Sequence, residues 1–102
     1  MFTADFLNDI QAAYGLTSDY QLAKKLGISP QAVNNYRAGR TFFSDEVALK
    51  VAHLLELDPL IVLACANADR YSRQGSAEVF DFWVALANQA LDGRVRMSHE
   101  AA

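Results

Sequence analysis

The stretch LAKKLGISPQAVNNYRAGR, residues Leu22–Arg40, decides the fold that we expect for this chain. Apolar residues recur at helical spacing in two short segments, 19–26 and 30–37, on either side of Gly27. Glycine takes a positive φ without strain, so the backbone reverses within a few residues there. Ala23 is small enough to lie where two helices cross closely. The stretch therefore predicts two helices joined by a tight turn.

Amide side chains lie together on the second of these segments. Gln31 and Asn35 are four residues apart, so they share one face of a helix, and Asn34 flanks them. Val33 and Tyr36 fall on the opposite face and are expected to be buried. An amide both donates and accepts hydrogen bonds, which suits the N6 and N7 edge of adenine in the major groove of DNA. The pattern favours base readout, and an ordinary solvated polar face is the alternative.

Positive charge surrounds the same segments. The chain carries a net charge of −3, yet residues 20–44 contain no Asp or Glu and four cations. A cluster of this kind is the electrostatic requirement for binding a phosphate backbone, and a chance gap in a solvated surface is the alternative. The hydroxyl groups of Ser29 and Thr41, before and after segment 30–37, add hydrogen-bond donors. The predicted phosphate contacts are Lys24, Lys25, Ser29, Arg37, Arg40 and Thr41.

The rest of the chain is expected to be helical. It has 102 residues, 52% of them hydrophobic, with few glycines and prolines, and no stretch alternates like a strand. Thr3 is the expected cap of the first helix, and serines precede several of the others. The predicted helices span about 4–14, 19–26, 30–37, 45–56, 59–71 and 76–92, and a flexible tail covers 93–102.

Composition excludes several classes of protein. One cysteine, Cys65, lies in an apolar run and excludes an internal disulfide, which fits a reducing, cytoplasmic environment. That run, 60–66, is too short to span a bilayer. His53 and His99 are isolated, and no spacing typical of a metal site or a catalytic triad occurs. We therefore expect no cofactor, no metal and no catalysis.

Residues 19–40 resemble the helix-turn-helix of the Cro/CI-type (XRE) family of phage and bacterial repressors, and residues 4–71 more loosely resemble its five-helix layout. The resemblance rests on Ala23, Gly27, Val33 and Tyr36 at the family's motif positions. It implies an all-α DNA-binding domain over 1–72 and a double-stranded DNA operator as partner. Asp19 stands where many relatives carry a glutamine that binds phosphate, and Pro30 where many carry a base-reading glutamine. The implied base contacts are Pro30, Gln31, Asn34 and Asn35.

An additional C-terminal helix, 76–92, lies outside that layout and carries a broad apolar face. It either covers the core of its own domain or pairs with the same helix of a second subunit, and aromatic residues are typical of interfaces. A twofold dimer would place two recognition helices about 34–36 Å apart, one turn of DNA. We favour the homodimer, with an interface formed by Val79, Phe80, Trp83, Leu86, Ala87 and Ala90.

The sequence thus predicts a sequence-specific transcriptional regulator, a repressor that binds an inverted-repeat operator as a homodimer. The alternative is a protein-interaction module, an antitoxin or an adaptor, that uses the same scaffold and the aromatic C-terminal helix to bind a second regulatory protein.

Overall fold

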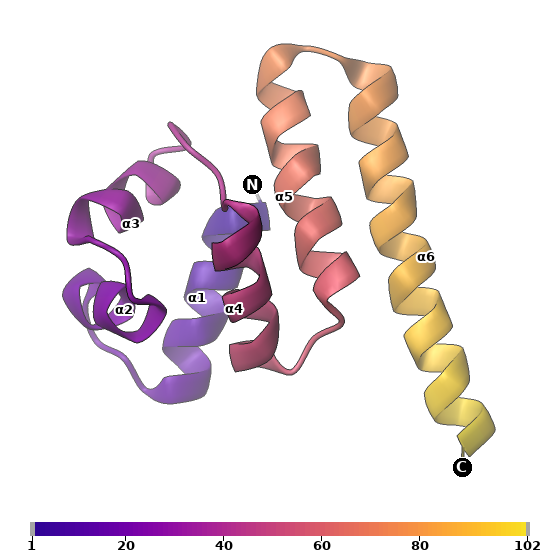
Figure 1. Ribbon diagram of the computed structural model, residues 1–102, viewed down its shortest axis with the longest axis horizontal. Coiled ribbons are helices and arrows are strands. Elements are labelled where there is room, and N and C mark those ends of the chain that lie inside the picture. The colour runs from indigo at the N-terminus through magenta and orange to yellow at the C-terminus, as the bar shows by residue number, and fades with distance from the viewer. Residues whose placement is uncertain (1, 102) are drawn as a thin grey trace.

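A computed structural model describes residues 2–101, and the side chains of 2–72 and 74–92. This part of the chain contains helices and no strand, so the all-α prediction is confirmed. The helices, drawn in Figure 1, are α1 (Phe2–Tyr14), α2 (Asp19–Leu26), α3 (Pro30–Arg37), α4 (Asp45–Leu55), α5 (Pro59–Gln74) and α6 (Ala77–Ala101).

Local signals in the sequence explain where α2, α3 and α4 begin. In each case a serine hydroxyl accepts a hydrogen bond from the backbone N–H three residues later, at Ser18, Ser29 and Ser44 with distances of 3.2, 3.1 and 3.3 Å. Gly27 follows α2 with a φ of 70°, and its N–H donates back to the last turn of that helix. The turn and both helices of the motif therefore lie at the predicted residues.

The start of α1 differs from the prediction. The helix begins at Phe2, and Thr3 lies inside it with its side chain buried, so Thr3 is not its cap. The carboxylate of Asp69, on α5, takes that role instead. Its two oxygens accept hydrogen bonds from the N–H groups of Phe2 and Thr3 at 3.1 and 2.7 Å. A buried negative charge complements the helix dipole there, so α1 and α5 are joined through a cap that is remote in sequence.

The last two helices are longer than predicted. Gly75, with a φ of 78°, ends α5 at Gln74, three residues beyond the predicted end at 71. The helix α6 continues through Gly93 to Ala101, whereas an end near 92 was predicted. Glycine inside a helix costs only about 1 kcal/mol relative to alanine, so it does not have to end one. The predicted flexible tail falls on 93–102, which lies outside the residues with described side chains.

The main core lies among α1 to α5. Its fully buried members include Leu7 and Ile10 of α1, Leu22 of α2, and Val33 of α3. Phe43, in the segment before α4, is also buried and packs edge to face on Tyr36, with ring centroids 5.1 Å apart. This ring anchors the segment between α3 and α4 to the core.

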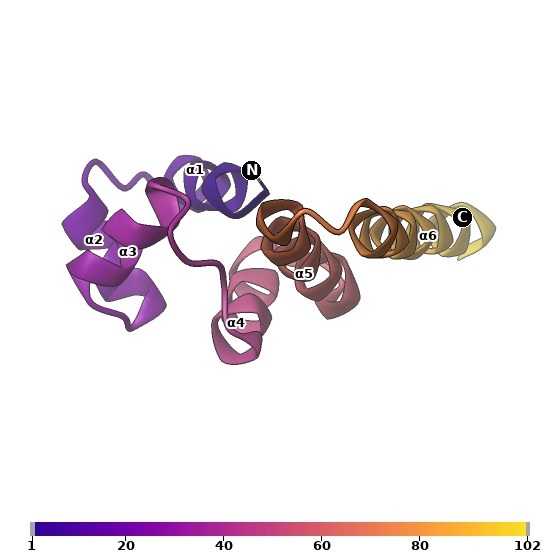
Figure 2. The ribbon, with the colours of Figure 1, turned by 90° about the horizontal axis from the view of Figure 1, so that it is seen from above.

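The helix α6 extends the molecule sideways. Among the described residues it contacts α5, and Figure 2 shows it at the end of a flat body of 40 × 37 × 19 Å. Four of the six residues predicted to form a dimer interface, Trp83, Leu86, Ala87 and Ala90, instead belong to an apolar cluster with α5 of the same chain. The cluster therefore favours the alternative of a helix that covers its own domain, at least on this face.

Candidate nucleic-acid interface

The helix α3 lies at the edge of the molecule, and other helices cover only one side of it (Figures 1 and 2). Val33 and Tyr36 are 0% and 8% exposed and fix that side to the core. Burial also raises the pKa of the Tyr36 hydroxyl above its ordinary value. The predicted base contacts Pro30, Gln31 and Asn34 are exposed, and Asn35 is half-buried. The polar face of α3 is therefore accessible to a partner.

A chain of hydrogen bonds runs along this face. Gln31 Nε2 donates to Asn35 Oδ1 at 3.2 Å, and Arg40 Nη1 donates to the same oxygen at 3.3 Å. These bonds leave the oxygen of Gln31 and the amino group of Asn35 for a further partner. The pair thus offers one acceptor and one donor, side by side on adjacent turns of the helix.

Four of the predicted phosphate contacts surround α3. Lys24, Ser29, Arg40 and Thr41 are exposed, two before the helix and two after it. The oxygen of Ser29 accepts the capping bond from Ala32 N, which leaves its hydroxyl proton for an anion. These groups are therefore accessible to an anion on either side of α3 in the sequence.

Arg37, also predicted to contact phosphate, instead joins three helices within the protein. Its Nε forms an ion pair with Asp19 at 2.9 Å, and its two terminal nitrogens donate to Asn8 Oδ1 and Gln11 Oε1 at 2.8 and 2.6 Å. The guanidinium therefore links α3 to α1 and α2. The ion pair gives Asp19 a role within the protein, at a position where many relatives carry a glutamine that binds phosphate.

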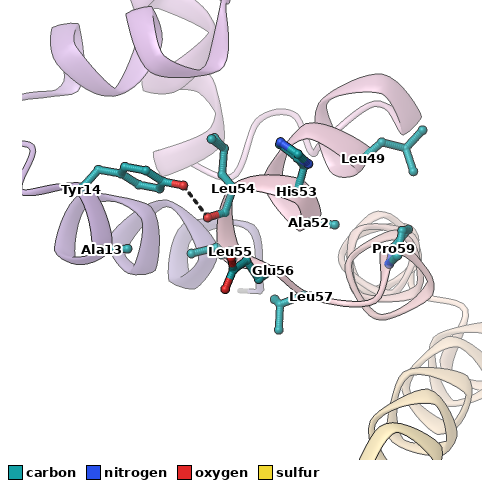
Figure 3. Close-up of a pocket in the computed structure, with 10 residues that line it drawn as sticks. All are labelled: Ala13, Tyr14, Leu49, Ala52, His53, Leu54, Leu55, Glu56, Leu57 and Pro59. Carbon is teal, nitrogen blue, oxygen red and sulfur yellow. Dashed lines mark hydrogen bonds between the residues drawn. The ribbon is translucent and has the colours of Figure 1, made fainter.

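Lys25 is directed toward the opposite end of the motif. Its ammonium lies 4.2 Å from the ring centroid of Tyr14, the last residue of α1, where the negative face of the ring attracts it. Tyr14 in turn donates to the carbonyl of Leu54 at 2.7 Å, as Figure 3 shows. This end of α1 is far from the segment that follows α3 (Figure 1), and the contact with Tyr14 holds the Lys25 ammonium on the side of α1.

A hollow of about 780 Å³ opens beside the same tyrosine, between the ends of α1 and α4 and the start of α5 (Figure 3). Most of its lining is apolar, and it includes a carboxylate and no lysine or arginine, so it does not suit a polyanion. The lining residues are Ala13, Tyr14, Leu49, Ala52, His53, Leu54, Leu55, Glu56, Leu57 and Pro59.

Two cations near the motif were not singled out from the sequence. The ammonium of Lys50, on α4, lies 3.0 Å from the position that a Cβ of Gly27 would take, at the C-terminal end of α2. Arg70, on α5, donates to the carbonyl of Phe43 at 3.2 Å. Lys50 and Arg70 lie 10 and 30 residues beyond Arg40, the last residue of the motif, so no pattern within the motif could have indicated them.

Other classes of site find little support in the described part of the chain. Its His, Cys, Asp and Glu side chains form no group of three that could hold a metal ion. Within the same limits, no helix is both long and apolar enough to cross a membrane.

Comparison with known proteins gives two matches and one negative result. The helix-turn-helix family matches residues 10–62, from α1 to the start of α5. "Uncharacterized protein Gp-c" of Pseudoalteromonas phage PM2 is 31% identical over 80 residues, which cover 78% of this chain and 87% of the phage protein. No solved structure matches the chain.

Proposed function

Because the chain belongs to the helix-turn-helix family of the Cro/CI (XRE) type, whose members are DNA-binding regulators, we propose that it is a repressor that binds an inverted-repeat operator as a homodimer. The recognition helix α3 enters the major groove, and the bound protein excludes RNA polymerase or a competing regulator from the promoter. The relative from a phage is compatible with a phage or prophage regulator.

The observation that carries this proposal is the hydrogen-bonded pair Gln31–Asn35 on the accessible face of α3. Its remaining acceptor and donor match the N6 amino group and N7 of an adenine, one hydrogen bond to each. A hydrogen bond already made within the pair holds both side chains in place, which lowers the entropy cost of binding a base. Pro30 and Asn34 lie on the same face and extend the readout to neighbouring base pairs.

The test begins with selection of preferred duplexes from a random DNA library by the wild-type protein. Fluorescence anisotropy then compares a selected duplex with an unrelated one at fixed salt. We expect Gln31→Ala or Asn35→Ala to reduce the preference for the selected duplex by about tenfold, since a good bidentate contact contributes ~1–3 kcal/mol. Binding to the unrelated duplex should change little.

Lys24→Gln is the matched control, because an exposed lysine before α3 is a candidate phosphate contact. It should weaken binding to both duplexes by the same factor. If the alanine variants also weaken both duplexes equally, the pair does not read bases. If the wild-type protein retains no duplex even at low salt, the repressor proposal fails and the protein-interaction module becomes the better hypothesis.

The homodimer part of the proposal requires a surface shifted toward Phe82, because Ala87 and Ala90 of the interface first predicted pack in the cluster with α5. Phe82 is 59% exposed on α6 and packs edge to face on Trp83, with ring centroids 5.2 Å apart. Val79 and Leu86 lie three and four residues away, on the same stripe of the helix, and are half-buried. This stripe borders the seam with α5, so a second copy of α6 that packs there would extend the existing apolar cluster.

Phe82→Glu tests this interface without entering the seam between α5 and α6. We expect the variant to sediment as a monomer and to lose affinity for an operator with two half-sites, while it keeps its helical circular dichroism. Leu91→Glu is the matched control, because Leu91 is 47% exposed on the other side of the same helix. A Phe82→Glu protein that sediments like the wild type would remove this stripe from the interface.

A further inference from the structure

A second cavity lies between the segment that follows α3 and the C-terminal part of α5. Its volume is about 590 Å³, and its lining comprises Arg40, Thr41, Phe42, Arg70 and Gln74. Two guanidinium groups, a hydroxyl and an amide supply hydrogen-bond donors, and no carboxylate is among the lining residues. A cavity with this lining suits an anion, because hydrogen-bond donors and two positively charged side chains converge on it.

Arg70 holds its position by bonds to neutral groups. Its Nη2 donates to the carbonyl of Phe43 at 3.2 Å, and its Nη1 donates to Asn67 Oδ1 at 2.5 Å. Within the described residues no carboxylate lies within ion-pair distance of it, whereas Arg37 is paired with Asp19. The guanidinium has five N–H donors in a rigid fork, so it can keep both bonds and still bind an anion.

Arg40, which also lines the cavity, is hydrogen-bonded to the polar face of α3. Arg40 donates through Nη1 to Asn35 Oδ1 at 3.3 Å, and its backbone N–H donates to the carbonyl of Asn35 at 2.9 Å. Asn35 belongs to the pair proposed to read a base. An anion bound between Arg40 and Arg70 would therefore lie close to the groove that α3 enters.

We propose that this cavity binds a backbone phosphate of the DNA, and that Arg70 is a phosphate ligand supplied by α5, outside the helix-turn-helix. The inference rests on the proposed function, since it requires α3 to enter the groove. The bound phosphate would bridge α5 and the α3–α4 segment, which fixes the depth and register of α3 against the duplex. Gln74 and Thr41 supply the additional donors.

The decisive measurement is the salt dependence of DNA binding. Each phosphate contact contributes about 0.9 to the slope of log K against log salt concentration. Arg70→Gln should reduce that slope by about one and weaken binding equally on selected and unrelated duplexes. When the salt concentration rises from 50 to 200 mM, the fold loss of affinity should therefore be about three to four times smaller for the variant than for the wild type. Arg70→Lys keeps the charge and should keep most of the slope.

Two further variants separate this contact from other effects. Lys25→Gln removes one positive charge from α2, where the ammonium lies over the ring of Tyr14 and away from the cavity, and should leave the slope unchanged. Gln74→Glu places a carboxylate in the cavity while it leaves the bonds of Arg70 to Phe43 and Asn67 intact, so it should weaken binding to every duplex even if Arg70→Gln proves unstable. An unchanged affinity for Gln74→Glu would overturn the proposal, as would an equal fall in slope for Arg70→Gln and Lys25→Gln.

Inorganic phosphate, titrated at constant ionic strength and followed by NMR chemical shifts, distinguishes the source of the anion. Saturable binding that Arg70→Gln abolishes, combined with an unchanged DNA slope, would identify a site for free phosphate and overturn the assignment to DNA. Failure of the wild-type protein to bind any duplex would refute the proposed function itself. Normal DNA binding with no effect of the Arg70 and Gln74 variants would refute only this inference.

Discussion

Replacing Arg37 with methionine separates a structural role from a phosphate contact. The side chain joins α3 to α1 and α2 through three partners, Asp19, Asn8 and Gln11. Methionine keeps much of the aliphatic length and removes the charge and all donors. We expect Arg37→Met to lower the free energy of unfolding and to leave the salt dependence of DNA binding unchanged, because the guanidinium is occupied within the protein.

The magnitude follows from the exposure of each contact. The ion pair joins side chains that are 28% and 48% exposed, so water screens it and it contributes about 0.5 kcal/mol. The bonds to Asn8 and Gln11, at 2.8 and 2.6 Å, contribute ~0.5–1 kcal/mol each after exchange with water. The sum is about 2 kcal/mol, which in a domain of this size lowers the Tm by about 10 °C.

Urea denaturation, followed by circular dichroism and by the fluorescence of Trp83, measures this loss. Asp19→Asn is the matched control: it keeps an acceptor for Arg37 but removes the charge of the ion pair and of the first turn of α2, and it should cost about 0.5 kcal/mol. In the double variant the two costs should not add, since Arg37→Met already removes the shared contact. The reasoning is refuted if Arg37→Met costs less than about 0.5 kcal/mol and reduces the DNA salt slope by about one, because Arg37 would then be a phosphate ligand.

Three further predictions concern stability and reactivity. Asp69→Ala leaves two N–H groups at the start of α1 without their buried acceptor, so it should lower the free energy of unfolding in urea by about 2 kcal/mol. Asp69→Asn keeps one oxygen and should lower it less. Burial and the charge of Asp69 raise the pKa of the Cys65 thiol to about 11. At pH 8, iodoacetamide should therefore label the folded protein at least on the order of a hundredfold more slowly than the urea-unfolded protein. Equal labelling rates would contradict a buried thiol. Gly27→Ala should lower the free energy of unfolding by ~1 kcal/mol or more, because φ is 70° and the new Cβ would lie 3.0 Å from Lys50 Nζ. Gly39→Ala should cost less in the same assay, because its φ is similar, at 73°, but the space around it is open.

How well the sequence predicted the end of each helix depended on where the residue that caps it lies. The bounds of α2 and α3 were predicted to the residue, because Ser18 and Ser29 cap the N–H groups three residues later in the same chain segment. The start of α1 was missed, because its cap is Asp69, 66 and 67 residues away. Gly75 is a local signal that does end α5, and the prediction placed that end a few residues too early.

The sequence by itself determined the helix-turn-helix, the polar face of α3 and the burial of Val33 and Tyr36. These features depend on periodicity and on caps, which act within about four residues along the chain. Only the tertiary structure decided how two arginines of the same motif differ. Arg37 meets Asp19 and Asn8, 18 and 29 residues away, and turns inward, whereas Arg40 borders the cavity that it shares with Arg70 of α5. A long flexible side chain takes its role from charges and acceptors that folding brings within its reach, and their positions are not encoded in the local pattern around it.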